Sequence, residues 1–420
     1  MFNKKYTEVV VLGAGPVGLV AAHVLADRKV DFVLFDREKR VNTQSYALAL
    51  HPDTLELLDR LNVVEPILER ALRIRRVAIY DAQQQQGVVD YGLLPMKYPF
   101  LAVIGQNELE QILVEALERK GHKPRWGHRV RCIEPAESDV HMTVDRLIDG
   151  MTGYAVAHFE PEIDKIFKYS ADYLLAADGY ASQARTAAGI DFPETAESQD
   201  YAIFEFETNI KIPQEMRMIV DGDKTHIFWP LPDNRCRFSF QMESGFAKNA
   251  SFNKDHSLID EAAQQVPELS NAHLEELLQR HAPWFIGASD SVKWRAMVHF
   301  ESHLAERFGR DRIWLVGDAA HLARPAGVLS MNVGMTEAAD LADRIGLSLQ
   351  DGLGYFSLKS YETDRLAEWR YLLNMGQSLQ GTDSSAEWLL QHKANLVGNL
   401  PASGVTLASI LGQLRLSQAA

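Results

Sequence analysis

Cysteine is scarce in this sequence, with only Cys132 and Cys236 among 420 residues. Two thiols cannot build a disulfide framework, and no CxxC or Cys/His spacing typical of zinc occurs, so no metal site is expected. Such low cysteine usage fits a reducing cytoplasm. Long apolar runs are also missing, since no stretch of about 18 or more uncharged apolar residues could span a bilayer. The first predicted strand starts near Thr7, too early for a cleaved signal peptide.

Positive charge is scarce as well. The 43 Lys and Arg residues face 57 Asp and Glu residues, which gives a formal net charge of −14. A surface this acidic argues against broad nucleic-acid binding and against a polybasic membrane contact. The apolar fraction of 46% and the charged fraction of 24% are close to globular averages, which excludes disordered and fibrous classes. The length suggests two or three domains.

A glycine-rich turn follows the first predicted strand. Gly13, Gly15 and Gly18 form a Gly-x-Gly-x-x-Gly motif that opens a predicted helix, and Asp36 ends the next predicted strand. Glycines permit a tight turn and close approach of a pyrophosphate, the helix N-terminus stabilises its charge, and Asp36 can accept a hydrogen bond from a ribose hydroxyl. The motif therefore predicts dinucleotide binding, without separating NAD from FAD.

A second motif is Asp178-Gly179, which follows a predicted strand at 174–177 and precedes Ser182 and Arg185. A carboxylate followed by glycine at a strand end suits a backbone that lies against a cofactor. An ordinary Asp-Gly turn is the alternative.

A third motif, Gly317-Asp318-Ala-Ala-His321, follows a predicted strand at 312–316 and leads into a helix that begins near Met331. A carboxylate that follows a strand and precedes a second helix N-terminus predicts another binding site for an anion and a sugar. Alternatively, Asp318 is only a helix cap and His321 a hydrogen-bonded loop histidine.

In this order and spacing, the three motifs resemble those of the flavoprotein aromatic hydroxylases, single-component FAD monooxygenases of the para-hydroxybenzoate hydroxylase fold. The resemblance covers about residues 5–370 and includes the segments 49–58, 106–110, 228–235 and 361–365. This family binds NADH or NADPH without a second Rossmann domain, and no second Gly-x-Gly-x-x-Gly occurs here.

The resemblance and the hydrophobic patterns together predict an α/β fold. A discontinuous Rossmann-like FAD-binding domain is expected at 1–74, 99–185 and 290–345. An inserted antiparallel β-sheet substrate domain is expected at 75–98 and 186–289, and C-terminal helices at 346–420. The other expected elements are a hairpin at 72–80 and 86–91, helices at 53–60, 106–120, 256–265 and 270–281, and antiparallel strands over 129–175 and 200–243.

The resemblance also implies the residues that bind FAD. The glycine turn would hold the ADP part, Asp36 its ribose, Asp318 the ribityl and pyrophosphate region, and Gln106 the flavin side. The Asp-Gly pair is associated with both FAD and the nicotinamide donor. The implied FAD-binding residues are Gly13, Gly15, Pro16, Val17, Gly18, Asp36, Arg37, Gln106, Val130, Asp178, Gly179, Gly317, Asp318, Pro325, Leu329, Ser330, Met331 and Asn332.

By the same resemblance, NADH or NADPH reduces FAD, O2 forms a flavin C4a-hydroperoxide, and a small phenol-like aromatic or heteroaromatic substrate is hydroxylated. Alternation in the 200–243 sheet sends some of its aromatic side chains to the flavin and others to the core. The expected substrate contacts are Phe204, Phe206, Phe228, Phe238 and Phe240. The catalytic group is unknown, with His226, Arg217 and Tyr201 as candidates, and the protein is expected to be a monomer or homodimer.

Two departures from the family stand out. Ser45 and Tyr46 occupy the usual place of a cofactor-contacting arginine, and Val328-Leu329-Ser330 replaces glycines and a glutamine in the loop after Pro325. Valine does not readily adopt the positive φ that glycine allows. We therefore expect a different loop path or a stiffer loop, with these side chains directed toward the flavin or its substrate.

The altered loop leaves two alternatives open. One is a flavoprotein of the same fold that performs a non-hydroxylating oxidation, an epoxidation or a rearrangement. The other is a flavin-binding regulator without turnover. A halogenase of this fold would carry a Trp-x-Trp segment, which the sequence lacks.

Overall fold

The computed structural model describes residues 4–41, 49–81, 84–136, 138–152, 158–243, 267–286, 291–351, 354–375, 379–381, 385–393 and 396–418. The helix expected at 256–265 and the departure at Ser45 and Tyr46 lie outside these residues.

The first sheet has seven strands, four of which run parallel in the order β17-β10-β1-β2. Residues 9–12 of β1 are at most 4% exposed, so the strand is buried on both faces, as the uninterrupted apolar run predicts. The strands are β1 (Lys5–Leu12), β2 (Phe32–Phe35), β8 (His128–Pro135), β9 (Val140–Thr152), β10 (His158–Ala176), β16 (Gly309–Arg310) and β17 (Ile313–Leu315).

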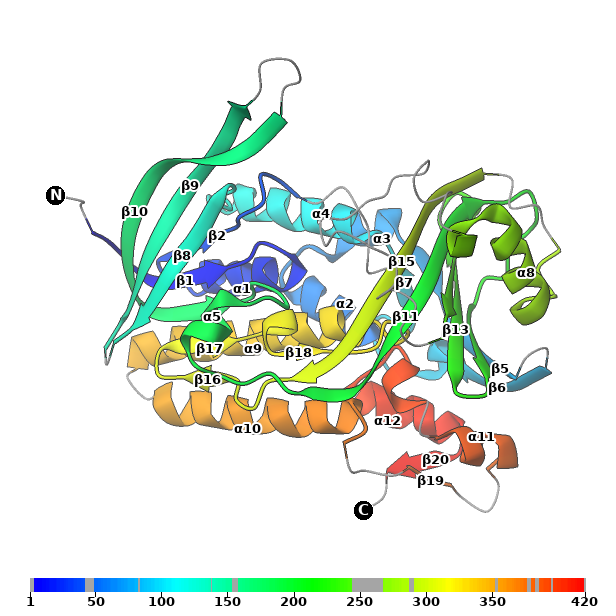
Figure 1. Ribbon diagram of the computed structural model, residues 1–420. Coiled ribbons are helices and arrows are strands. Elements are labelled where there is room, and N and C mark those ends of the chain that lie inside the picture. The colour runs from blue at the N-terminus through cyan, green and yellow to red at the C-terminus, as the bar shows by residue number, and fades with distance from the viewer. Residues whose placement is uncertain are drawn as a thin grey trace.

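Helices α1 (Pro16–Asp27) and α9 (Leu329–Asp351) contact each other, and α10 (Gly354–Leu372) lies beside α9 (Figure 1). Helix α4 (Gln106–Arg119) packs on α1 and matches the predicted amphipathic helix. Strand β10 is antiparallel to β9 at its start and parallel to β1 at its end, and the β9–β10 ribbon projects beyond the sheet (Figure 1).

The second sheet has eight strands in the order β18-β15-β11-β14-β13-β12-β5-β6. The predicted strands over 200–243 are present, but the sheet is not wholly antiparallel, because β12 and β5 are parallel. Strand β15, expected within the first domain, pairs with β11 in this sheet. Its strands are β5 (Arg76–Asp81), β6 (Gln84–Asp90), β11 (Glu194–Glu207), β12 (Met216–Asp221), β13 (Lys224–Leu231), β14 (Arg235–Gln241), β15 (Ser291–Leu304) and β18 (His321–Leu322).

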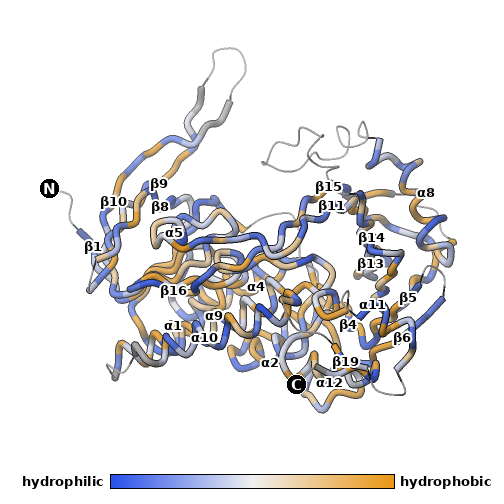
Figure 2. The backbone as a smooth tube through the Cα atoms, turned by 60° about the horizontal axis from the view of Figure 1, so that its bottom comes forward, coloured by the Kyte–Doolittle hydropathy of each residue, from blue (hydrophilic) through white to orange (hydrophobic). Residues whose placement is uncertain are grey.

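The two faces of the second sheet have different neighbours. Helix α8 (Asn271–His281) lies beside the sheet (Figure 2). The face toward α8 forms a separate aromatic core with it. Tyr201, Ile203 and Trp229, on the opposite face, belong to the large core shared with the first sheet. Side-chain alternation along the strands therefore decides which residues can approach the first sheet.

A small sheet has three strands in the order β3 (Ala49–Leu50), β7 (Leu101–Val103) and β4 (Leu72–Ile74). The helices α2 (Pro52–Arg60) and α3 (Val64–Arg70) lie between β3 and β4 in the chain. Residues 72–74, predicted as part of the hairpin, instead form β4, and the observed hairpin consists of β5 and β6.

The C-terminal segment is not wholly helical, because β19 (Leu379–Gly381) and β20 (Leu416–Gln418) pair beside α11 (Glu387–His392) and α12 (Gly404–Gln413). Both helices contact β6, and Leu389, Leu407 and Leu411 are buried, so the C-terminal segment packs onto the body of the protein. In the described part of the chain, no helix is long and apolar enough to cross a membrane.

Candidate functional site

All three sequence motifs leave the first sheet at one edge. Leu12 of β1 lies level with Phe35 of β2 and Ala176 of β10, and Ala176 lies level with Leu315 of β17. Because these strands are parallel, the glycine turn, Asp36, Asp178 and Asp318 follow neighbouring carboxyl ends. Ligands of open α/β sheets bind at this edge.

The glycine turn is built for close backbone packing. Gly13 has φ +93°, and a Cβ there would lie 2.1 Å from Ala177 O. A Cβ at Gly18 would lie 1.9 Å from Gly13 O, whereas no described atom lies within 4 Å of the corresponding position at Gly15. Helix α1 begins at Pro16, and no side chain of the described residues caps it. The helix start therefore offers backbone N–H groups beside open space, which suits a phosphate.

Asp36 fixes the glycine turn against β2. Its carboxylate accepts hydrogen bonds from Ala14 N at 2.6 Å and Glu38 N at 2.8 Å. Burial raises its pKa above the ordinary value. Each oxygen keeps a second lone pair for a sugar hydroxyl. The neighbouring Arg37 is exposed and lies 3.4 Å from Glu38.

The Asp178 carboxylate mainly accepts hydrogen bonds from its own turn. Its oxygens accept hydrogen bonds from Ser182 Oγ at 2.6 Å and Gln183 N at 2.8 Å, at the start of α5 (Gln183–Ala187). Burial raises the pKa of Asp178. Arg185 Nη1 donates to Ala319 O at 2.9 Å and so ties the second motif to the third, a contact that the sequence did not reveal.

Asp318 is the residue that the third motif presents to open space. It lies in the single turn of the 3-10 helix η3 (Gly317–Ala319), where Gly317 has φ +59°. The side chain is exposed while Gly317 and Ala319 are buried. Burial nevertheless raises the pKa of Asp318, and the charge of His321 opposes this shift. A side chain both exposed and closely surrounded is typical of a concave surface.

The start of α9 is tied to β3 by Asn332. Its Oδ1 accepts a hydrogen bond from His51 N at 2.8 Å, and its Nδ2 donates to Ala49 O and Val328 O, both at 2.9 Å. Asn332 is 1% exposed, and these three hydrogen bonds commit its side chain to holding the backbone. His51 Nε2 donates to Gly327 O at 2.9 Å, and burial lowers the pKa of His51 to about 3, so the ring is neutral.

The altered loop does not take the expected form. Val328 adopts φ +50°, the left-handed conformation that we expected valine to avoid. Leu329 is 1% exposed and belongs to the core, so its side chain does not face a ligand. Ser330 Oγ accepts a hydrogen bond from Ala323 N at 3.1 Å. The loop thus keeps a backbone shape suited to glycine and holds it by packing and hydrogen bonds.

Other predicted cofactor residues lie in α4, in β8 and beside the altered loop. Gln106 opens α4 and donates to Glu110 at 2.9 Å. Val130 is 6% exposed within β8. Pro325 and Met331 are partly exposed beside the altered loop.

A cavity of about 510 Å³ lies between the second sheet and the start of α4. Its polar centre is a buried ion pair, in which Arg237 donates to Glu205 at 2.8 and 3.2 Å and lies 5.0 Å from the ring centroid of Trp294. The cavity is lined by Arg70, Val103, Ile104, Gly105, Asn107, Glu108, Glu205, Leu231, Pro232, Asp233, Arg235, Arg237, Lys293 and Trp294.

The predicted substrate-contacting phenylalanines do not line this cavity. All five are 0% exposed and lie in the separate core against α8. Phe204 pairs with Phe238 and Glu205 with Arg237, so the phenylalanines and the ion pair occupy opposite faces. The charged residue inside the Phe204-Glu205-Phe206 run was the signal for the face toward the first sheet. The predicted substrate contacts that pack in this separate core are Phe204, Phe206, Phe228, Phe238 and Phe240.

The catalytic candidates are also divided between the faces. His226 is 1% exposed and packs on His281 of α8, with ring centroids 3.9 Å apart. Arg217 donates to Glu215 at 3.0 Å and lies over Trp284, also on that face. These positions argue against a role for His226 or Arg217 at the cavity.

Tyr201 alone faces the large core. Its hydroxyl is 3.3 Å from Gln199 and Gln241. Burial raises its pKa, and the charge of Arg324, from the loop after the third motif, opposes this shift.

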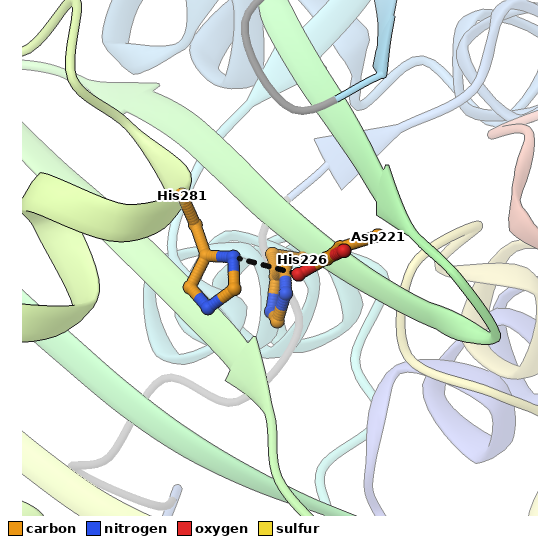
Figure 3. Close-up of side chains that lie close together, drawn as sticks. All are labelled: Asp221, His226 and His281. Carbon is orange, nitrogen blue, oxygen red and sulfur yellow. Dashed lines mark ion pairs between the residues drawn. The ribbon is translucent and has the colours of Figure 1, made fainter.

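Asp221, His226 and His281 are the one group in the described residues whose potential metal ligands gather within 4.8 Å (Figure 3). His281 Nδ1 lies 3.4 Å from Asp221 Oδ2. His226 Nδ1, however, accepts a hydrogen bond from Gln241 N at 3.1 Å, which places the proton of the neutral ring on Nε2. His226 then presents an N–H to the cluster, which does not suit a cation.

The model of the FAD binding domain family matches residues 6–374, so the chain belongs to this family. Pentachlorophenol 4-monooxygenase of Sphingobium chlorophenolicum is 24% identical over 93% of this chain and 66% of its own length. Para-nitrophenol 4-monooxygenase of Pseudomonas sp. (strain WBC-3) is 25% identical over 85% of this chain and 82% of its own length. The chain spans less of 6-methylpretetramide 4-monooxygenase of Streptomyces rimosus, 59% of its length.

Solved structures show the same fold. The crystal structure of p-nitrophenol 4-monooxygenase from Pseudomonas putida matches with a TM-score of 0.70 and 20% identity, over 98% of this chain and 94% of that chain. The flavin-dependent monooxygenase PieE, in complex with FAD and substrate, matches with a TM-score of 0.69 and 19% identity, over 97% and 68% of the two chains. The chain therefore has the fold of flavin-dependent monooxygenases.

Proposed function

We propose that this protein is an FAD-dependent monooxygenase that uses NADH or NADPH and O2 to hydroxylate a small aromatic or heteroaromatic substrate. The names of its relatives, which act on pentachlorophenol and para-nitrophenol, support this substrate class. The observation that carries the proposal is the convergence of the glycine turn, Asp318 and the start of α9 at one edge of four parallel strands.

In this proposal the edge binds FAD along its length. The N-terminus of α1 beside Gly15 holds the pyrophosphate, and Asp36 accepts from the adenosine ribose. Asp318 accepts hydrogen bonds from the ribityl hydroxyls, and the backbone at the start of α9 faces the flavin ring, where a helix N-terminus stabilises negative charge. When bound, FAD supplies the transfer of electrons from NAD(P)H and the activation of O2.

The substrate pocket in this proposal is the cavity beside α4. Asn332, at the start of α9, is bonded to Ala49 of β3, and Ala49 pairs with Val103 of β7, which lines the cavity. Adjacent strands lie about 4.8 Å apart, so the cavity lies one strand from the proposed flavin position. Its volume of about 510 Å³ suits a small ring compound.

The cavity residues would orient the substrate and exclude water. The Trp294 indole offers a flat apolar wall for a ring, and the Glu205–Arg237 pair offers an acceptor and a donor to a phenolic hydroxyl. A phenolate would bind near Arg235, which is the half-exposed second partner of Glu205 at 3.1 Å. Such contacts hold one ring carbon toward the flavin.

Purification tests the proposal first: the protein should be yellow and release FAD, not FMN, on denaturation. Aromatic compounds should then be screened for stimulated oxidation of NADH or NADPH, with the product mass measured. A product heavier by one oxygen atom supports hydroxylation. Colourless protein that cannot be reconstituted with FAD contradicts the proposal, flavin without stimulated turnover favours a regulator, and a product without added oxygen favours another oxidation.

A further inference from the structure

A buried glutamate on α9 holds both ends of the turn that carries Asp318. Glu337 is 0% exposed. Its Oε2 accepts hydrogen bonds from Gly317 N at 3.3 Å and from His321 Nε2 at 2.7 Å. Gly317 directly precedes Asp318, and His321 follows it three residues later. One carboxylate oxygen thus fixes the chain on both sides of Asp318.

The other oxygen of Glu337 connects this turn to α10. Its Oε1 accepts a hydrogen bond from Trp369 Nε1. The Trp369 indole is 0% exposed and stacks on the His321 ring, with centroids 3.6 Å apart. Phe308 also stacks on His321, at 6.2 Å. The His321 ring is therefore held by packing as well as by its hydrogen bond.

Helix α9 packs closely on the turn that carries Asp318, and this allows the Glu337 side chain to reach Gly317 and His321. A Cβ at Gly334 would lie 3.1 Å from Gly317 Cα, and Gly334 lies one helical turn before Glu337. The turn has a buried base and one exposed residue, because Asp318 is exposed while Gly317, Ala319 and His321 are buried. The positions of these buried residues therefore determine the direction of the Asp318 carboxylate.

We propose that Glu337 is a positioning residue for FAD, which acts through Gly317 and His321 to aim the Asp318 carboxylate at the ribityl chain. Glu337 itself does not touch the cofactor. This inference rests on the proposed function, because it assumes that Asp318 contacts FAD. Hydrogen bonds weaken steeply with angle, and binding groups must be held to within about 0.5 Å, so a loosened turn would lower FAD affinity.

The test compares Glu337→Gln with Glu362→Gln in the full-length protein. Glu362 is a matched control because it is a buried carboxylate that accepts hydrogen bonds from Phe308 N and Gly309 N, each at 3.2 Å. It holds a different turn, which meets the Asp318 turn through the stacking of Phe308 on His321. Both substitutions should lower stability. Only Glu337→Gln should raise the Kd for FAD, by about tenfold, whereas Glu362→Gln should stay within about twofold.

A double-mutant cycle separates positioning from general loosening. In an Asp318→Ala background, Glu337→Gln should weaken FAD binding no further, because its effect passes through Asp318. The same tenfold loss in that background, or an unchanged Kd for Glu337→Gln in the wild-type background, overturns the inference. Failure of the wild-type protein to bind FAD contradicts the proposed function instead.

A second pair of variants keeps the test decisive if Glu337→Gln does not fold. His321→Gln can place an amide N–H near the Nε2 position and should keep the Kd within about threefold, whereas His321→Asn is too short and should lose about tenfold. Equal affinities of the two variants contradict the inference. The indole N–H NMR signal of Trp369 gives a spectroscopic check, since it should shift when FAD binds to the wild-type protein and much less in Asp318→Ala.

Discussion

The left-handed conformation of Val328 leads to a prediction about stability. Its φ of +50° brings Cβ close to the carbonyl oxygen, at a strain of about 1–2 kcal/mol for a residue with a side chain. Glycine has no such strain but loses about 0.5–1 kcal/mol of extra backbone entropy on folding. Val328→Gly and Val328→Ala both remove the two methyl groups and differ only by Cβ, so their comparison reports mainly the backbone term. The glycine variant should be more stable than the alanine variant by about 0.5 kcal/mol.

Val333 provides the matched control. It is 1% exposed in α9, where the helical backbone favours alanine over glycine by about 1 kcal/mol. The difference between the two variants should therefore change sign between the positions and differ by about 1.5 kcal/mol in total. Urea unfolding of the four variants gives these values. If alanine is as favourable at 328 as at 333, Val328 is not left-handed and the strain argument is wrong.

The same substitution tests the function of the loop. Val328→Gly should leave the Kd for FAD within a few-fold, because the proposed phosphate and ribose contacts lie elsewhere. It should change the rate of flavin reduction by NAD(P)H, or the fraction of NAD(P)H consumption that yields product and not hydrogen peroxide. Unchanged reduction and coupling would make the departure at 328 neutral for function.

Other substitutions test the remaining assignments. Asp318→Ala should raise the Kd for FAD by about ten- to a hundredfold with little loss of fold, measured by flavin fluorescence and circular dichroism, and an unchanged Kd would leave Asp318 as a cap only. His51, whose folded pKa of about 3 is below its unfolded value, stays neutral while the unfolded chain takes up a proton. Stability should therefore fall by about 1.4 kcal/mol per pH unit from pH 6.5 toward 3 through this group, and His51→Gln should remove that slope in urea unfolding at pH 7 and 5. Phe238→Ala should destabilise by about 3–5 kcal/mol yet leave substrate KM unchanged, and a changed KM would return this face to the substrate site.

The edge of the first sheet could be predicted from the sequence because its signals are local. The run Val9-Val10-Val11-Leu12 indicates a strand covered on both faces, and the glycine spacing specifies the turn that follows. The same holds for helix α4, whose apolar residues repeat with helical spacing. Each signal lies within about 20 residues, so no knowledge of distant contacts was needed.

The faces of the second sheet could not be predicted in this way. Alternation showed that Phe204 and Phe206 share a face, but not that α8 would cover it. The ties of Asn332 to Ala49 and of Glu337 to Trp369 join residues 283 and 32 positions apart. Neither pair has a local pattern, because a buried polar group needs a partner of suitable geometry from any part of the chain.

Three carboxylates follow three parallel strands of this sheet, and the structure gives them different roles. Asp36 accepts hydrogen bonds from Ala14 N of the glycine turn and from Glu38 N of its own turn, and Asp178 accepts one from Gln183 N of its own turn, so both carboxylates stabilise local backbone. Asp318 is exposed, and the hydrogen bonds that shape its turn go to Glu337 instead. A carboxylate whose oxygens satisfy its own turn has fewer lone pairs left for a ligand. Among these three positions, Asp318 therefore has the largest capacity to bind incoming hydroxyls, while Asp36 keeps a second lone pair on each oxygen, because Glu337 takes over the structural role at the Asp318 turn.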